Sequence, residues 1–336
     1  MAFFNKLIAA LLCLSFSSFS SVASTQHESG VRDRTPVERH GQLSVEGRFV
    51  VGAHGEAVSL AGPSFFWSNT GWPGEKYYNA QTVERFAKDW RAGMVRAAIA
   101  AENEGSYLTD PKANTERAYA IIDAAIAQGV YVIVDWHSHR AEENVTEATA
   151  FFTDIATRYG DKPNVIYEIY NEPLDTTDWE TVIKPYAEEI IGVIREIDPD
   201  NIIVVGTQSW DQRVDKAADD PIVGQKNLVY ALHFYAASHK DYHLKLAQYA
   251  VDKGLPLMIT EWGSVTYDGD GSVDYESSLV WLAFIRENKL SHAIWAVSDK
   301  DEGSAMLRPG ASSNGDWSEN DLSDSGKFAR DVIRNW

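Results

Sequence analysis

The sequence predicts an α/β protein with one folded domain, a single (β/α)8 barrel of the TIM-barrel type preceded by a short N-terminal β-hairpin. Eight apolar runs of strand length follow one another between residues 57 and 298, and segments with apolar residues at helical spacing separate them. The runs are apolar almost throughout, as parallel strands are when both of their faces are buried. A doubly wound open sheet is the alternative, but no glycine-rich phosphate loop follows the first strand.

The elements can be assigned in order along the chain. Residues 41–60 predict the hairpin, which we expect to cover one end of the barrel. The clearest helices are expected at 82–93, 114–129 and 179–197, where glycine or proline closes the helical pattern. The eight strands are expected at 57–66, 94–99, 130–136, 165–171, 202–207, 228–235, 255–262 and 292–298.

Residues 1–24 have the pattern of a secretory signal peptide. One early base precedes an apolar run from Leu7 to Phe16, and small residues follow it. This run is too short to span a bilayer. Residues 25–40 are polar and without periodicity and predict a disordered lead-in, so the catalytic or binding domain is expected at 41–336. We therefore expect a secreted protein, extracellular or periplasmic, that has no membrane contact after the signal is cleaved.

The composition limits the classes of partner and chemistry. Acidic residues outnumber basic ones 49 to 30, and the formal net charge of −19 argues against nucleic-acid and anionic-membrane partners. A well-solvated surface explains this acidity, with adaptation to salt as the alternative. The single cysteine, Cys13, lies in the predicted signal, which excludes disulfides and thiolate chemistry from the mature chain. We expect a monomer with no cofactor and no metal, and we interpret the acidic run 268–274 as a solvated loop.

Polar and aromatic residues gather where the predicted strands end. In a (β/α)8 barrel the C-terminal ends of the strands meet at one mouth, and function is located there. Each residue taken alone has an ordinary interpretation, such as a core tryptophan, a hydrogen-bonded core histidine or a loop charge. Their coincidence at the strand ends favours a functional site. In chain order they are Trp67, Arg96, His137, Asn171, Glu172, Trp210, His233, Tyr235, Glu261, Trp295 and Lys300.

Two glutamates among tryptophans fit glycoside hydrolysis. One carboxylic acid protonates the leaving oxygen, while the other carboxylate attacks the anomeric carbon or activates water. Tryptophan rings stack on the apolar faces of sugars. A zinc site at His137 and His139 is the rival interpretation, because an i, i+2 pair lies on one face of a strand. No third ligand stands at a fixed spacing, and neither an HExxH motif nor a G-x-S-x-G elbow occurs.

These residues stand in motifs that resemble glycoside hydrolase family 5, and most closely its bacterial endoglucanase (cellulase) subgroup, subfamily 2. The resemblance covers residues 41–336. The asparagine–glutamate–proline run and the TEWG run, in this order on the fourth and seventh strands, form its most specific pair. The motifs are VRAA (95–98), VDWHSH (134–139), IYEIYNEP (166–173), LHFYA (232–236), TEWG (260–263) and WAVSDKDEG (295–303).

The resemblance implies the catalytic roles. Glu172 matches the acid/base, and Glu261 matches the nucleophile of a retaining, double-displacement mechanism. Arg96 and Tyr235 match the donors that hydrogen-bond the nucleophile, and His233 matches the histidine beside the acid/base. We therefore expect the pKa of Glu261 to be lowered by Arg96 and Tyr235, and the pKa of Glu172 to be raised by burial or by the charge of Glu261. A retaining pair requires a separation of about 5–5.5 Å.

The resemblance also implies how the sugar is held. Asn171 matches the residue that binds the 2-hydroxyl, while His137 and Trp295 match a ligand and an aromatic wall before the cleaved bond. Outer contacts are implied for Trp67, Trp210 and Lys300, whereas His139, Asp299 and Glu302 stay open.

The expected activity is that of an endo-β-1,4-glucanase acting on cellulose, related β-glucans or cello-oligosaccharides. A β-mannanase, a xylanase or a mixed-linkage glucanase is the alternative within the same family. A secreted carbohydrate-binding protein without catalysis is the alternative in another class, and the presence of both glutamates argues against it.

Overall fold

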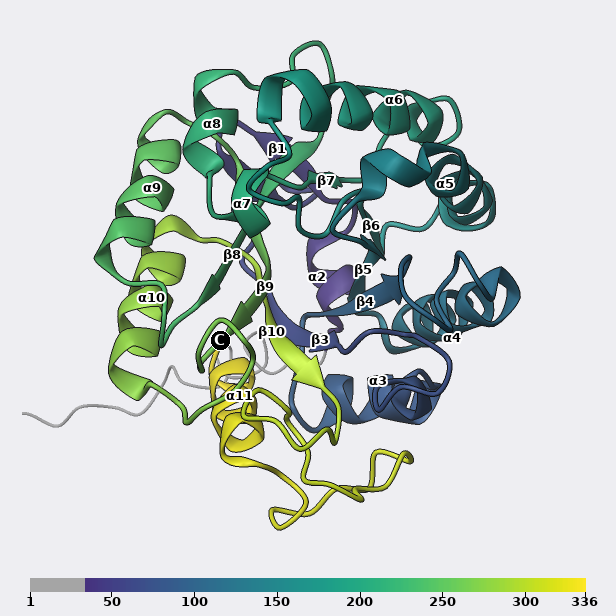
Figure 1. Cartoon of the computed structure of the whole chain (residues 1–336), viewed down its shortest axis with the longest axis vertical. Helices are drawn as coiled ribbons and strands as arrows, with labels where there is room; N and C mark the ends of the chain where they lie inside the picture. Colours follow the sequence, from purple (N-terminus) through teal and green to yellow (C-terminus); the bar gives the residue numbers. More distant parts are fainter. Residues whose placement is uncertain (1–33) are drawn as a thin grey trace, which may run out of the picture. The chain divides into compact units, whose positions relative to one another are not determined.

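The computed structural model describes residues 34–336, which contain the predicted closed barrel of eight parallel strands. In Figure 1 the strands lie at the centre, and β10 closes the ring by pairing with both β9 and β3. The strands are β3 (Ala61–Phe65), β4 (Met94–Ala100), β5 (Tyr131–His137), β6 (Val165–Glu168), β7 (Ile203–Val205), β8 (Leu228–Tyr235), β9 (Leu257–Gly263) and β10 (His292–Val297).

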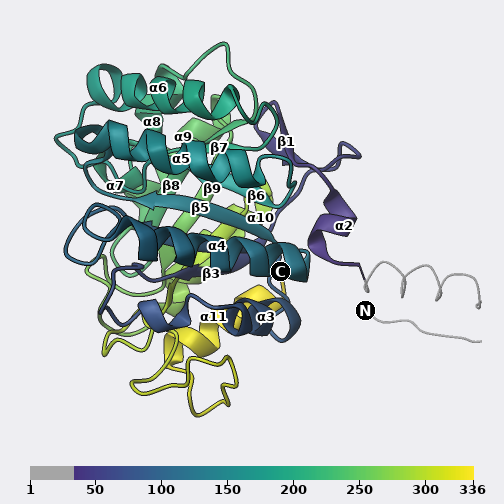
Figure 2. The same ribbon diagram turned by 90° about the vertical axis from the view of Figure 1, so that its right-hand side faces the viewer.

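Helices surround these strands, as Figures 1 and 2 show. Local sequence sets their ends: α4 begins after Asp110, which accepts from the Ala113 N–H, and ends at Gly129 in the left-handed conformation. Within residues 34–336 no helix combines the length and the apolar character needed to cross a membrane. The helices are α3 (Ala80–Lys88), α4 (Pro111–Gln128), α5 (Val145–Tyr159), α6 (Lys184–Arg195), α7 (Gln208–Asp211), α8 (Val214–Asp219), α9 (Asp241–Asp252), α10 (Tyr275–Asn288) and α11 (Asp324–Arg334), with the short turns η1 (Glu75–Tyr77), η2 (Ala141–Asn144) and η3 (Trp179–Ile183).

The predicted hairpin is formed by β1 (Ser44–Glu46) and β2 (Phe49–Val51), which pair antiparallel. Leu43 and Val50 belong to an apolar cluster that also contains Met94 and Tyr131, the first residues of β4 and β5. The hairpin therefore covers the N-terminal end of the barrel. The opposite end is the mouth where the predicted site residues gather.

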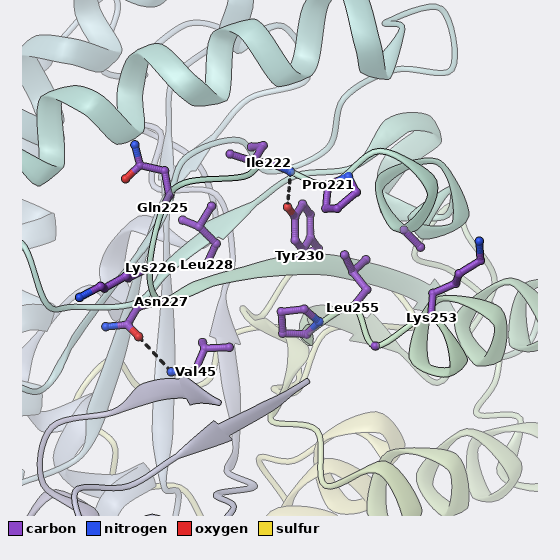
Figure 3. Close-up of a pocket in the computed structure, with 13 residues that line it drawn as sticks. Val45, Pro221, Ile222, Gln225, Lys226, Asn227, Leu228, Tyr230, Lys253 and Leu255 are labelled. Atoms are coloured by element: carbon purple, nitrogen blue, oxygen red, sulfur yellow. Dashed lines mark hydrogen bonds between the residues drawn. The ribbon is translucent and has the colours of Figure 1, made fainter. Parts of the chain in front are cut away.

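A cavity of about 410 Å³ lies beside the hairpin. Figure 3 shows two hydrogen bonds along its wall. The Val45 N–H donates to the Asn227 side chain at 3.0 Å, and the Ile222 N–H donates to the Tyr230 hydroxyl at 2.8 Å. None of the site residues predicted from the sequence lines this cavity.

The predicted lead-in is partly ordered, which corrects the sequence analysis. Residues 36–40 form the short helix α2 (Pro36–His40), whereas disorder was expected over 25–40. The cause is a capping box, in which Thr35 accepts from the Glu38 N–H and Glu38 accepts from the Thr35 N–H. The predicted signal peptide, residues 1–24, lies outside the described residues.

Candidate active site

Arg96, on β4, is fully buried at the mouth of the barrel and joins three carboxylates. Its guanidinium nitrogens lie 2.9 Å from Glu261 Oε2, 2.7 Å from Glu168 Oε2 and 2.9 Å from Asp135 Oδ2. Its Nη2 also donates to Asn171 Oδ1 at 2.6 Å. Buried charges need such partners, so Arg96 fixes the positions of acids from β5, β6 and β9 relative to one another.

Glu261 is held at the end of β9 by two donors. Its Oε2 accepts from Arg96 at 2.9 Å, and its Oε1 accepts from the Tyr235 hydroxyl at 2.8 Å. Burial, followed by the charge of Glu172, nevertheless raises the pKa of Glu261 above its usual value. The expectation of a lowered pKa is wrong, because loss of solvation outweighs the two donors.

Glu172 follows the end of β6 and lies between two histidines. Its Oε1 is 2.9 Å from His233 Nδ1, and its Oε2 is 3.4 Å from His139 Nε2. Burial opposes ionisation, but the hydrogen bonds with His139 and His233 outweigh it and lower the pKa of Glu172 to about 2. The expected rise in this pKa is therefore wrong, because the two imidazoles hold protons more strongly than the carboxylate does.

The end of β6 explains how adjacent side chains both reach the mouth. β6 ends at Glu168, three residues earlier than the sequence predicted. The N–H groups of Asn171 and Glu172 then donate to the carbonyls of Trp136 (3.3 Å) and Ser138 (3.2 Å). Because regular strand alternation has ended, Asn171 contacts Arg96 while Glu172 contacts the histidines.

The two glutamates face each other across the mouth. One oxygen of Glu172, one of Glu261 and one nitrogen of His233 all lie within 4.8 Å of one another. These three residues could together hold a metal ion, but each is already bonded within the site, and the positive charge of Arg96 beside Glu261 opposes a cation there. The arrangement suits two carboxylates that act on one bond.

His137, Trp295 and Trp67 form an aromatic wall. The His137 and Trp295 rings stack with their centroids 5.4 Å apart and 7° between their planes. The Trp67 ring meets His137 edge-on at 4.2 Å. The Nδ1 of His137 lies 2.6 Å from Asp135 Oδ2, and burial lowers the pKa of the His137 ring. His137 therefore contributes a neutral imidazole to the wall. The alternative of a zinc site at His137 and His139 gains no support, because neither belongs to the group of potential metal ligands found within residues 34–336, which consists of Glu172, His233 and Glu261.

The outer contacts lie at the edges of the mouth. Trp210 is 37% exposed and lines a cavity of about 440 Å³ together with Glu172, Tyr235 and Tyr267. Lys300 forms an ion pair with Glu302, a residue whose role was not assigned from the sequence. The Lys300 ammonium lies 5.5 Å from the centre of the Phe66 ring. The structure thus brings Trp210 next to Glu172. Lys300 lies near the aromatic wall, because the Phe66 ring that it contacts is 5.3 Å from the Trp295 ring.

Two carboxylates that support the site were not among the site residues predicted from the sequence. Asp211, on α7, is fully buried with Oδ2 3.3 Å from His233 Nδ1. Glu102 accepts from the backbone N–H of His139 at 3.3 Å, and its Oε1 lies 2.5 Å from His139 Nδ1. Both residues follow strand ends, and this position in the sequence was the signal that could have identified them. It was not used, because an acid in a polar loop is usually a solvated charge.

Comparisons with known proteins show which family this chain resembles. A family model described as Cellulase (glycosyl hydrolase family 5) matches residues 51–301. Endoglucanase Z of Dickeya dadantii (strain 3937) is 47% identical over 294 residues, 88% of this chain and 66% of that relative. Endoglucanase N of Pectobacterium atrosepticum is 40% identical over 303 residues, 89% of this chain and 67% of that relative. The catalytic domain of Thermobifida fusca endoglucanase Cel5A, solved in complex with cellotetraose, has a TM-score of 0.84 and 36% identity and covers 90% of this chain and 100% of that chain.

The barrel and its facing carboxylates in an aromatic-lined mouth define a glycoside hydrolase. The chain belongs to glycosyl hydrolase family 5. It spans about two thirds of the length of the two curated relatives named above.

Proposed function

We propose that this protein is a retaining endo-β-1,4-glucanase that cleaves internal bonds of cellulose or related β-glucans. The observation that carries the proposal is the placement of Glu172 and Glu261 with oxygens within 4.8 Å of each other. A retaining pair stands about 5–5.5 Å apart, whereas an inverting pair leaves about 6.5–9.5 Å for a water molecule. The endoglucanase names of the relatives and the cellotetraose bound by the Thermobifida fusca enzyme support the choice of glucan.

In the first step Glu261 attacks the anomeric carbon and forms a glycosyl-enzyme bond. Arg96 and Tyr235 orient its two oxygens, so one lone pair is directed at the sugar. The C–O bond to the leaving sugar breaks as Glu172 donates a proton to that oxygen. Because the pKa of Glu172 is lowered and those of the neighbouring His139 and His233 are raised, a proton must move from a histidine to Glu172 before or during this step.

In the second step Glu172, again ionised, removes a proton from water. The hydroxyl attacks the anomeric carbon, the bond to Glu261 breaks, and the product keeps the original anomeric configuration. Asn171, whose Oδ1 accepts from Arg96 at 2.6 Å, would bind the sugar 2-hydroxyl. The wall of His137, Trp67 and Trp295 would pack against the sugar before the cleaved bond, and Trp210 would contact the leaving sugar.

The experiment that tests this function is hydrolysis of cellohexaose followed by proton NMR. Early accumulation of β-anomers with internal cleavage products supports a retaining endoglucanase, whereas early α-anomers reject the retaining mechanism. Rates on carboxymethyl-cellulose, mannan, xylan and mixed-linkage glucan decide between the specificities that share this pair of glutamates. Release of no reducing ends from any of them favours the carbohydrate-binding alternative.

Secretion and the extent of the domain are part of the same proposal. We propose that residues 1–24 are removed as a signal peptide, that residues 41–336 carry the catalytic domain, and that the mature protein is a monomer that binds cello-oligosaccharides. Membership of subfamily 2 stays a prediction. Mass spectrometry of the protein secreted by a bacterial host, together with its mass in solution, tests these statements.

A further inference from the structure

Each ring nitrogen of His139 lies near a carboxylate from a different strand end, with a hydrogen bond at Nδ1 and an ion-pair contact at Nε2. Its Nδ1 lies 2.5 Å from Glu102 Oε1, in the loop after β4, and its Nε2 lies 3.4 Å from Glu172 Oε2, after β6. Glu102 also accepts from the His139 backbone N–H at 3.3 Å, which fixes the ring relative to the chain. The Glu102 carboxylate, the His139 imidazole and the Glu172 carboxylate thus lie in sequence, each next to the following one.

The two histidines that contact Glu172 differ in their access to solvent. The His139 side chain is 29% exposed, whereas the His233 side chain is 1% exposed. His233 is also closed in by other partners, since its Nε2 is bonded to the Thr260 hydroxyl at 2.8 Å and its Nδ1 faces Asp211 at 3.3 Å. A proton that moves between bulk water and the group formed by Glu172, His139 and His233 can therefore pass through the partly exposed His139 but not through the buried His233.

We propose that His139 passes the proton between solvent and the acid/base Glu172, and that Glu102 is the positioning residue that holds His139 for this transfer. This inference rests on the proposed function. The sequence motifs assign no role to His139, and the proposed two-step hydrolysis requires only that one of the imidazoles supply the proton.

The proton balance is closed over one catalytic cycle. Before the first step His139 Nε2 gives its proton to Glu172 Oε2, so a charged imidazolium and a carboxylate become a neutral imidazole and a carboxylic acid. Glu172 gives that proton to the leaving oxygen as the C–O bond breaks. In the second step Glu172 takes a proton from the attacking water and passes it to His139, which restores the imidazolium; His139 can then exchange this proton one for one with solvent.

The groups that face His139 favour its protonated form. Glu102 and Glu172 are the carboxylates bonded to it, and together they raise its pKa to about 10 against the opposing effect of burial. The Trp67 ring stacks on the imidazole at 5.5 Å, and the Tyr170 hydroxyl donates to the His139 carbonyl at 3.0 Å. The hydroxyl of Tyr170 is in turn bonded to Glu142 on η2, and the neutral His137 ring lies on the side of the aromatic wall.

The test compares a substrate that needs the proton with one that does not. Cellohexaose has a sugar alkoxide as its leaving group and needs protonation, whereas 2,4-dinitrophenyl β-cellobioside releases a phenolate that does not. For His139→Gln we expect kcat/KM on cellohexaose to fall by about 30-fold or more, with less than about a 3-fold change on the aryl cellobioside. Added imidazole should restore part of the cellohexaose activity of His139→Ala, because the site is open to solvent.

Glu102→Gln acts through His139 alone and guards against a folding defect in the histidine variants. Removing the charge of Glu102 weakens proton binding at His139, so the alkaline limb of kcat/KM on cellohexaose should move to lower pH by about half a unit or more. Glu104→Gln, an exposed position in the same loop, is the matched control and should keep the profile of the unmodified protein.

Each outcome decides the inference. Equal losses on both substrates indicate a binding or structural contribution and overturn it, as does a Glu102→Gln profile that matches the unmodified protein. If the unmodified protein cleaves neither substrate, the proposed function fails and the inference fails with it. If the unmodified protein cleaves both and only the variants behave otherwise than expected, the inference fails and the proposed function stands.

Discussion

Oδ2 of Asp211 lies 3.3 Å from Nδ1 of His233, and both side chains are buried. Within residues 34–336 this oxygen has no hydrogen-bond partner, while Oδ1 of Asp211 accepts from the Thr207 N–H. Burial works against a charged His233, but Asp211 and the nearby glutamates raise its pKa well above the usual value. Burial also raises the pKa of Asp211 well above its usual value, so the buried pair of Asp211 and His233 holds a proton beside Glu172.

Asp211→Asn removes that support, and we expect the pKa of His233 to fall. His233 then loses its proton at a lower pH, so the alkaline limb of kcat should move to lower pH and kcat at neutral pH should fall about tenfold. KM should change little, because Asp211 does not line the cavity next to Glu172. Full pH–rate profiles measure this effect, and Asp215→Asn, an acid on α8 paired with Arg213, is the control. An unchanged profile contradicts the assignment.

The two glutamates should respond differently to substitution. Glu261→Gln removes the proposed nucleophile, so turnover of every substrate should be lost and azide should not restore it with retention. Glu172→Ala should cost about 10²–10⁴-fold on cello-oligosaccharides, while the first step with an aryl cellobioside survives. Azide should then release a β-glycosyl azide from Glu172→Ala, detectable by mass spectrometry and NMR. Identical behaviour of the two variants would show the roles to be wrongly assigned.

Arg96→Met should destabilise the domain and abolish activity together. The change leaves Glu168, Asp135 and Glu261 buried without their shared cation, and breaking such pairing costs about 3–5 kcal/mol. Urea denaturation followed by tryptophan fluorescence measures the loss. Arg158→Met, an exposed arginine on α5, is a control expected to change the free energy of unfolding by less than about 1 kcal/mol. A fully stable Arg96→Met protein would contradict the network described for this residue.

The dependence of the free energy of unfolding on pH in the acidic range should depend on Glu172. Its pKa in the folded protein is lowered to about 2, so its ionised form contributes stability above the usual glutamate pKa. That contribution disappears as the pH falls from about 4.5 towards 2. Glu172→Gln should therefore lose less stability than the unmodified protein over this interval, with a difference on the order of 2 kcal/mol in urea unfolding. Parallel curves for the two proteins would rule out the shift.

Trp210 should contribute to binding of the leaving sugars. Trp210→Ala removes the exposed ring beside Glu172 and should raise KM for cellohexaose about tenfold, since aromatic contacts contribute on the order of 1 kcal/mol or more. The rate on 2,4-dinitrophenyl β-cellobioside should not change, because this substrate has no sugar there. Tyr275→Ala removes a more exposed aromatic ring on α10, outside the cavity, and serves as the control.

The sequence by itself determined the order of the elements and the identity of the facing glutamates. Each of the eight strands overlaps the apolar run that predicted it, because both faces of a parallel barrel strand are buried and the pattern is therefore strong. Arg96, Tyr235 and Glu261 came together as expected, since the C-terminal ends of parallel strands meet at one mouth. The helix at 36–40 was missed because its signal is a local capping box without an apolar face.

Only the tertiary structure decided where the protons are held. The pKa of Glu172 and that of Glu261 moved in the directions opposite to those expected, because burial and two histidines acted on them together. Asp211 and Glu102 entered the site only when the fold placed them beside His233 and His139. Electrostatic effects depend on distances and on solvent exclusion across strands far apart in sequence, and no local pattern of residues encodes those quantities.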